Sequence, residues 1–378
     1  MTVQDTIQTL RGSLRGQFID RDDAIDGIMA ALLADEHVFL LGPPGTGKSA
    51  LAAAVCKAIR GGRTFNVLLT KTTVPDEIWG PIDLMAFDKG RFERRSENYL
   101  PTATIAFLDE LWRGSSPILN GLLRAVNERV YEHDGKLKKL PLRMVIGASN
   151  SLPESNDLDA LYDRFALRYV IGRVRGRTGR ERLLKMKGNP SVQASITLDE
   201  LDAARAEVNA VQVSDAMYDR MLAVWDDLST AGHDISERRW RQLVKLLRAK
   251  AYIEGRSEVE PADLSLIADS GWYDPKDRHD ILSRTLKIGA PSVARGIEVL
   301  DLAKTVIGEI PSHDGNNDAK VATAAGKAKK RIAELLDDLQ TLEDQAIPGE
   351  LPKLRDIRSH VSTLRKDAIR IMRDVVNA

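Results

Sequence analysis

The clearest chemical signal in the sequence is a loop rich in glycine at residues 42–49. It reads Gly42-Pro43-Pro44-Gly45-Thr46-Gly47-Lys48-Ser49 and fits the pattern GxxxxGK[ST]. Glycines at these positions let backbone N–H groups surround a phosphate at the positive end of the following helix. Lys48 is expected to reach the β- and γ-phosphates, and Ser49 to bind Mg²⁺. Because the loop lies between an apolar run, 37–41, and an expected helix, 48–59, it predicts an ATP- or ADP-binding site rather than a structural glycine turn.

Two acids and an amide complete this chemistry. Asp109 and Glu110 directly follow the apolar run 104–108, and Asn150 follows the run 144–148. Asp109 at a strand tip can hold Mg²⁺, directly or through water, while Glu110 can polarise the attacking water and Asn150 can orient it. Each of them alone is equally compatible with a solvated strand end. Together with the phosphate-binding loop they predict hydrolysis of ATP.

The elements that must position these residues form an α/β core. Apolar runs at 37–41, 65–69, 104–108, 144–148 and 167–171 read as buried strands, with helical segments between most of them. This alternation predicts a largely parallel sheet. Beyond about residue 175 the strand signal stops and helical periodicity begins. We therefore expect a nucleotide-binding core at 1–178, an all-helical lid domain at 179–285 and a C-terminal helical region at 286–378.

The C-terminal region has a pattern of its own. Apolar residues recur in steps of three and four on both sides of a break at 346–349. This indicates an antiparallel helical hairpin, which either packs on itself and the body or binds a partner as a coiled coil. We expect a flexible joint before it, at 311–317.

Composition narrows the class of protein. The 378 residues include 55 Lys and Arg against 55 Asp and Glu, and a single cysteine, Cys56. A zero net charge argues against a dedicated nucleic-acid binder, although it leaves room for a local basic patch. The first 20 residues lack the apolar core of a secretory signal, and no run approaches the length of a membrane span. We therefore expect a cytoplasmic protein without disulfides.

The three chemical elements, in this order and before a helical domain, resemble the AAA+ ATPases. Within them the chain resembles the MoxR group, and specifically the RavA family, over roughly residues 15–280 and again in the tail. Besides the loop and the acids, the resemblance is carried by WGP at 79–81, NYLP at 98–101, NER at 127–129, ASNSLPE at 148–154, ALYDR at 160–164, SERRW at 236–240, GRS at 255–257 and WYD at 272–274.

This resemblance implies roles for several residues. Asn150 matches the sensor 1 residue, and Arg164 resembles the arginine finger that enters the next subunit's site. Arg168 and Arg129 are competing finger candidates, and a helix-capping surface arginine is the alternative reading of Arg164. A finger of this kind adds positive charge at the γ-phosphate only when a neighbour docks.

Further roles concern the lid and the base of the nucleotide. Arg238 resembles sensor 2, a lid arginine that detects the γ-phosphate, and its neighbour Arg239 is the rival candidate. Phe18 and Ile19 occupy the adenine-contacting position of the family, although both are also ordinary core residues.

Two segments extend the minimal core. A polar stretch at 83–97 resembles the insertion that the MoxR group carries in its second helix. Residues 129–140 predict a β-hairpin that turns at Asp134 and Gly135. Hairpins of this kind face the pore of the ring in relatives, so both segments are either substrate contacts or ordinary surface structure.

By this resemblance the chain is an ATP-hydrolysing homo-oligomer, expected to form a hexameric ring. It is expected to act as a chaperone-like remodeller of protein complexes together with a von Willebrand factor A (vWA) domain protein. Better-known RavA proteins carry a small β-rich domain inserted in the tail, and 312–318 leaves no room for it here. Two alternatives stay open: a nucleic-acid remodelling motor or loader, and a nucleotide-gated scaffold.

Overall fold

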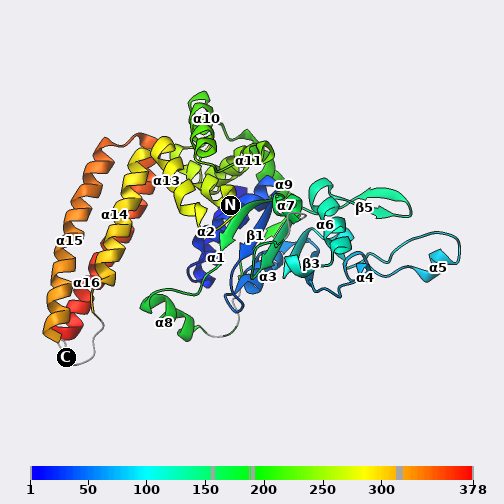
Figure 1. Cartoon of the computed structure of the whole chain (residues 1–378), viewed down its shortest axis with the longest axis horizontal. Helices are drawn as coiled ribbons and strands as arrows, with labels where there is room; N and C mark the ends of the chain where they lie inside the picture. Colours follow the sequence, from blue (N-terminus) through cyan, green and yellow to red (C-terminus); the bar gives the residue numbers. More distant parts are fainter. Residues whose placement is uncertain (1, 155–157, 187, 189–191, 312–317, 377–378) are drawn as a thin grey trace. The chain divides into compact units, whose positions relative to one another are not determined.

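The computed structural model describes residues 2–154, 158–186, 188, 192–311 and 318–376 (Figure 1). The chain divides into two compact units. Unit 1 comprises Met1–Val213, Ile235–Val259 and Asp269–Pro275, and unit 2 comprises Ser214–Asp234, Glu260–Ala268 and Lys276–Ala378. The flexible joint expected at 311–317 and the segment 312–318, considered for the β-rich insertion, both include residues 312–317, which lie outside the described residues.

Unit 1 is built on a five-stranded parallel sheet in the order β3-β4-β7-β1-β8. The strands are β1 (His37–Leu41), β3 (Thr64–Leu68), β4 (Ile105–Asp109), β7 (Met144–Ser149) and β8 (Phe165–Val170). Every residue of β1 and β7 is buried, as expected for central strands with both faces covered. Because β4, β7 and β1 are neighbours, the loops that follow them meet at one edge of the sheet.

The expected α/β core with a parallel sheet is thus confirmed, and its five strands lie within two residues of their predicted bounds. One boundary is wrong. The helix expected over 48–59 is α3 (Lys48–Lys57), because Ile59 belongs instead to β2 (Ile59–Arg60). β2 pairs in parallel with β9 (Ile196–Thr197), a partner that is too distant in sequence for local periodicity to indicate.

Helices cover the sheet and extend unit 1. The helix α2 (Asp22–Ala34) is buried along most of its length and contacts α11. The other elements of these segments are α1 (Val3–Gln17), α4 (Pro75–Trp79), α5 (Leu84–Phe87), η1 (Leu100–Thr102), η2 (Leu111–Arg113), α6 (Ser116–Glu128), α7 (Asp159–Tyr162), α8 (Arg177–Lys185), α9 (Leu198–Ala210), α11 (Glu237–Ile253) and α12 (Ile267–Gly271). Side-chain caps fix several helix starts; the Ser236 hydroxyl, for example, accepts the Arg239 N–H at the start of α11.

The predicted hairpin is present as β5 (Val130–His133) and β6 (Lys136–Lys139), paired antiparallel. Asp134 and Gly135 both have positive φ, which is the geometry of a two-residue hairpin turn. The hairpin is tied to the insertion at 83–97. The backbone N–H of Phe92 donates to Asp134 Oδ1 at 3.0 Å, and the Asp134 N–H donates to the Phe92 carbonyl at 3.1 Å.

Unit 2 is helical. It contains α10 (Asp215–Thr230), η4 (Pro261–Leu266), α13 (Asp277–Gly289), α14 (Pro291–Gly308), α15 (Asp318–Gln345), η5 (Pro348–Glu350) and α16 (Leu351–Val376). The predicted antiparallel hairpin is confirmed as α15 and α16, which contact each other along their length. None of the helices within the described ranges is both long and apolar enough to cross a bilayer.

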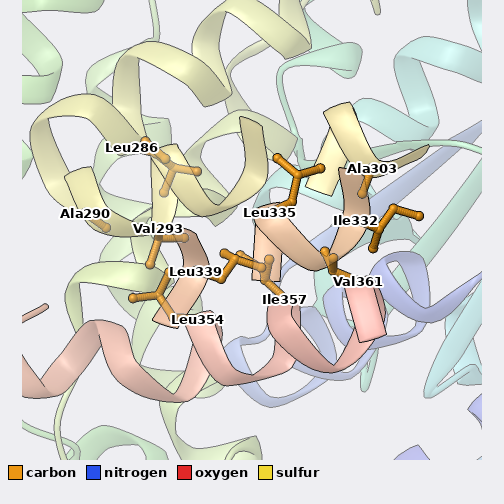
Figure 2. Packing of buried hydrophobic residues seen from close by; sticks show 11 residues of the cluster. Leu286, Ala290, Val293, Ala303, Ile332, Leu335, Leu339, Leu354, Ile357 and Val361 are labelled. Carbon is orange, nitrogen blue, oxygen red and sulfur yellow. The ribbon is translucent and has the colours of Figure 1, made fainter. Parts of the chain in front are cut away.

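The hairpin has a third partner that the periodicity did not reveal. Helix α14 packs against both α15 and α16, so that the tail is a three-helix bundle (Figure 1). Its core includes Val293, Leu335, Leu339 and Leu354 (Figure 2). Close packing is possible because α14 has small residues at the interface: a Cβ added at Gly296 would lie 2.8 Å from Leu354 Cδ2.

Candidate active site

The phosphate-binding loop, 42–49, leaves β1 between the ends of its two neighbouring strands. The Gly42 N–H donates to the Ser149 carbonyl at 3.0 Å, and a Cβ at Gly42 would lie 2.2 Å from the Ile171 carbonyl oxygen. Only glycine therefore fits at this position. Gly45 and Gly47 have φ of 77° and 87°, a region that side chains disfavour. The loop ends at the N-terminus of α3, where free N–H groups favour an anion.

Lys48 is held inside the loop. Only 6% of it is exposed, and its Nζ donates to the carbonyls of Gly42 at 2.5 Å and Pro43 at 3.1 Å. A third hydrogen bond, at 3.0 Å, goes to Asn150 Oδ1. Burial lowers the pKa of Lys48, and the attraction of Asp109 and Glu110 opposes this effect. The ammonium therefore lies within the loop, in contact with Asn150 at the end of the neighbouring strand β7.

The two predicted metal ligands lie side by side. The Ser49 hydroxyl donates to Asp109 Oδ2 at 3.0 Å, and Asp109 Oδ1 accepts the backbone N–H of Glu110 at 3.0 Å. A hydroxyl and a carboxylate at this spacing are hard oxygen donors of the kind that Mg²⁺ prefers. The residues present therefore fit a magnesium ion that arrives with a nucleotide.

Glu110 and Asn150 are in direct contact. Asn150 Nδ2 donates to Glu110 Oε1, while the Oδ1 atom of the same amide accepts from Lys48. Glu110 Oε2 also lies 3.4 Å from Arg113 Nε. Glu110 is thus connected to Lys48 through one amide, and a carboxylate in such a position can act as a general base toward water.

Arg21 belongs to this site, and sequence analysis missed it. Its buried guanidinium donates to the carbonyls of Thr46 at 3.1 Å and Gly172 at 2.5 Å, and burial lowers its pKa. It thereby joins the phosphate-binding loop to the segment after β8. An arginine just before a helix looks like a surface residue, and its partners lie 25 and 151 residues away. No local pattern indicates such bonds.

The predicted adenine contacts, Phe18 and Ile19, are both buried at 8% exposure. They lie next to the segment that Arg21 contacts. A Cβ at Gly179 would lie 3.4 Å from Ile19 Cγ2, and the Arg175 N–H donates to Asp20 Oδ2 at 2.8 Å. Residues 19–21 are therefore in contact with residues 172–179, next to the phosphate-binding loop.

Two of the three finger candidates have their guanidinium groups bound within their own subunit. Arg168 is fully buried, donates to the carbonyls of Tyr162 and Trp272, and lies 3.7 Å from the centre of the Tyr162 ring. Burial lowers its pKa to about 9. Arg129 bonds the Asp35 carbonyl and lies 3.2 Å from the Asp35 carboxylate. Both have the environment of structural arginines.

Arg164 has a longer ion contact than Arg129 but a less exposed side chain. Its Nη1 lies 3.7 Å from Asp163 Oδ2, and its side chain is 15% exposed. The Arg129 side chain is 28% exposed.

The two lid candidates differ in exposure. Arg239 is 1% exposed and donates to Asp163 Oδ1 at 2.6 Å and to the Ser270 carbonyl at 2.8 Å. Arg238 is 47% exposed, with its Nη1 3.9 Å from Asp163 Oδ2. Arg239 therefore stabilises the fold, whereas Arg238 is accessible to a ligand.

Comparison with known families matches two adjoining segments. Residues 5–211 match a family described as the MoxR domain in the MoxR-vWA-beta-propeller ternary systems, and residues 209–284 match an AAA lid domain. The first segment contains the phosphate-binding loop, Asp109, Glu110, Asn150 and Arg164, and the second contains Arg238.

Similar proteins agree with this match. An uncharacterized protein of Methanocaldococcus jannaschii, MJ0812, is 32% identical over 305 residues, which is 80% of this chain and 81% of the relative. A second protein of that organism, MJ0079, is 36% identical over 276 residues, 73% and 72% of the two chains. A crystal structure of a candidate ATPase from Cytophaga hutchinsonii superposes with a TM-score of 0.62 at 17% identity, over 76% of this chain and 94% of the other, so it supports the fold alone.

Proposed function

Because the chain belongs to the MoxR family of AAA+ ATPases, we propose that it forms a hexameric ring that hydrolyses ATP with Mg²⁺ to remodel protein complexes. The observation that carries this proposal is the contact chain from Lys48 through Asn150 to Glu110, beside the Ser49–Asp109 pair. Lys48, the Ser49–Asp109 pair and Glu110 lie together at the ends of three strands, which supports a site for hydrolysis of ATP.

Each of these residues has a distinct task in the proposed reaction. The backbone of 42–47 and Lys48 bind the β- and γ-phosphates and offset their charge. Ser49 and Asp109 would hold Mg²⁺, which would supply further positive charge at the phosphates. Glu110 takes a proton from the attacking water, and Asn150 keeps that water and the carboxylate aligned.

The remaining site residues serve recognition and assembly. We assign Phe18 and Ile19 to the adenine, and Arg238 to the γ-phosphate of the subunit's own nucleotide as sensor 2. Arg164 is the arginine finger that completes the next subunit's site. In this scheme hydrolysis requires a neighbour, since the finger comes from another copy of the chain. The functional division is a core at 1–178, a lid at 179–285 and a tail at 286–378.

A protein with a vWA domain is the proposed partner. The matched family is described by ternary systems that contain one. The RavA-like assignment and a place in the cytoplasm remain part of this proposal, and the three-helix tail is its candidate surface for the partner.

The test is phosphate release by the purified chain with and without Mg²⁺, together with its sedimentation with and without ATP. We expect ATP-dependent assembly and Mg²⁺-dependent release, which Lys48→Ala abolishes. Release that Lys48→Ala leaves unchanged would refute the assignment. A Glu110→Gln variant loaded with ATP is then expected to co-purify a vWA-domain protein, with Lys48→Ala as the matched control that retains no nucleotide.

Exposed lysines on one hairpin strand are the reason to test for a second function, that of a nucleic-acid motor. The strand β6 exposes Lys136, Lys138 and Lys139 at the hairpin. Strong stimulation of ATP hydrolysis by DNA or RNA, falling as salt rises, would favour a nucleic-acid motor over a protein remodeller.

A further inference from the structure

A single carboxylate lies between the two arginines proposed to contact nucleotide. Asp163 comes directly before Arg164, and its Oδ2 is 3.7 Å from Arg164 Nη1. The same oxygen is 3.9 Å from Arg238 Nη1. On the proposed function, Arg238 serves the subunit's own site and Arg164 the neighbour's. Asp163 therefore lies close to one residue proposed for the subunit's own nucleotide site and to one proposed for the neighbour's site.

Asp163 is also bound firmly to the start of α11. It accepts a hydrogen bond from Arg239 at 2.6 Å and from the Ser236 hydroxyl at 3.2 Å. Ser236 caps this helix by accepting the Arg239 N–H at 3.3 Å. Because Arg239 is 1% exposed, its pair with Asp163 is shielded from solvent, and breaking it would leave a buried charge unpaired. The carboxylate must therefore follow any movement of this helix end.

The backbone next to Asp163 passes such a movement to Arg164. The Asp163 N–H donates to the Asp159 carbonyl at 2.8 Å, and the Arg164 N–H donates to the Leu161 carbonyl at 3.1 Å. Residues 159–164 therefore form one hydrogen-bonded turn. Within this turn, the Tyr162 ring packs edge-on against the Tyr273 ring, with 5.4 Å between the ring centres. A shift of the carboxylate relative to this turn changes the direction in which Arg164 points.

The partners of Asp163 differ in how easily they leave. The buried Arg239 pair is short, whereas Arg238 is 47% exposed and distant, so solvent screens its attraction to Asp163. A γ-phosphate carries more charge than one carboxylate and can draw Arg238 away without breaking the Arg239 pair.

We propose that Asp163 is a positioning residue that couples nucleotide binding in its own subunit to the placement of Arg164 at the neighbour's site. When Arg238 turns to the γ-phosphate, the start of α11 shifts, and Asp163 transmits this shift to residues 159–164. The inference rests on the proposed function, since it needs Arg238 to contact phosphate.

Amide hydrogen exchange on the full chain tests the coupling directly. Exchange is measured with Mg²⁺ and with or without a non-hydrolysable ATP analogue, and it is followed at 42–49 and at 159–164. In the unmodified chain we expect the analogue to slow exchange at 42–49 and to change it by about fivefold at 159–164, the lower end of typical coupling between sites. In Asp163→Asn the effect at 42–49 should persist and the effect at 159–164 should vanish.

Two further variants separate coupling from simple folding defects. Asp159→Asn, one turn earlier in the same segment, is the matched control and should behave as the unmodified chain. Ser236→Ala removes the hydroxyl contact to Asp163 and also the side-chain cap of α11, which lowers the stability of that helix, but it leaves the buried ion pair intact. It should therefore fold even where Asp163→Asn does not, and should reduce the response at 159–164.

Each outcome has a distinct meaning. Without an effect of the analogue at 42–49 in the unmodified chain, the proposed function itself fails. An effect at 42–49 without one at 159–164 overturns the coupling and leaves the function standing. The coupling is equally overturned by a full response at 159–164 in folded Asp163→Asn or, if that variant does not fold, in Ser236→Ala.

Discussion

Replacing Glu110 with glutamine separates nucleotide binding from chemistry. The substitution keeps the length of the side chain and an oxygen that can still accept from Asn150 Nδ2. What it removes is the negative charge that takes a proton from water. The ion pair with Arg113 is also lost, but Arg113 is 65% exposed, so this contact contributes little to stability.

The expected magnitude follows from that one change. A positioned general base contributes roughly 10²- to 10⁴-fold, which corresponds to about 3–5 kcal/mol of the activation barrier. Affinity for ATP should stay within about twofold, since Lys48 and the loop backbone are untouched. Steady-state phosphate release by Glu110→Gln measures the loss of turnover. Equilibrium binding of a fluorescent ATP analogue to the same variant measures the affinity.

The exposed Glu298 on α14 offers a matched control, because Glu298→Gln removes the same charge far along the chain from the site. We expect no change in either measurement for this control. If turnover by Glu110→Gln stays within about threefold of the unmodified chain, Glu110 is not the base and the assignment of the site is wrong.

Three further predictions concern the fold that holds the site. Gly42→Ala places a Cβ 2.2 Å from the Ile171 carbonyl and should lower Tm and weaken ATP binding, whereas Gly12→Ala in α1, with nothing within 4 Å, should stabilise by about 0.5–1 kcal/mol in thermal unfolding. His37 has its pKa lowered to about 3 from an ordinary 6.5, mainly by burial, so its stabilising effect is complete above pH 6.5 and is lost as pH falls toward 3. The loss should be about 2 kcal/mol at pH 5 and absent in His37→Gln, as urea unfolding at pH 5 and 7.5 would reveal. Leu339→Ala in the tail core should cost about 2–5 kcal/mol in urea unfolding, and an unchanged midpoint would contradict the bundle packing.

The sequence predicted the sheet and the glycine-rich loop because both leave local patterns. A buried parallel strand must be almost wholly apolar, so β1 and β7 are visible as runs of hydrophobic residues. The phosphate-binding loop needs glycines with positive φ at fixed spacing, and Gly45 and Gly47 have it. In both cases the physical requirement acts on neighbouring residues.

What the sequence missed depends on distant partners. Arg21 binds carbonyls at Thr46 and Gly172, and its own surroundings in the sequence are those of an exposed helix start. Asp163 was noted as part of a motif, but its role as acceptor for Ser236 and Arg239 arises only when α7 and α11 pack together. The third helix of the tail bundle has its own apolar repeat at Val293, Ile297 and Leu300, but such a repeat does not indicate which helices it packs against.

The backbone conformation of Glu110 lowers the stability of the fold at a position where the proposed function needs a carboxylate. Its φ of 50° and ψ of 44° are left-handed, a region that costs a residue with a Cβ about 1 kcal/mol or more relative to glycine. A glycine there would relax the backbone, yet it would remove the carboxylate at the end of β4. On the proposed function, Glu110→Gly should therefore raise the unfolding free energy while lowering the rate of ATP hydrolysis.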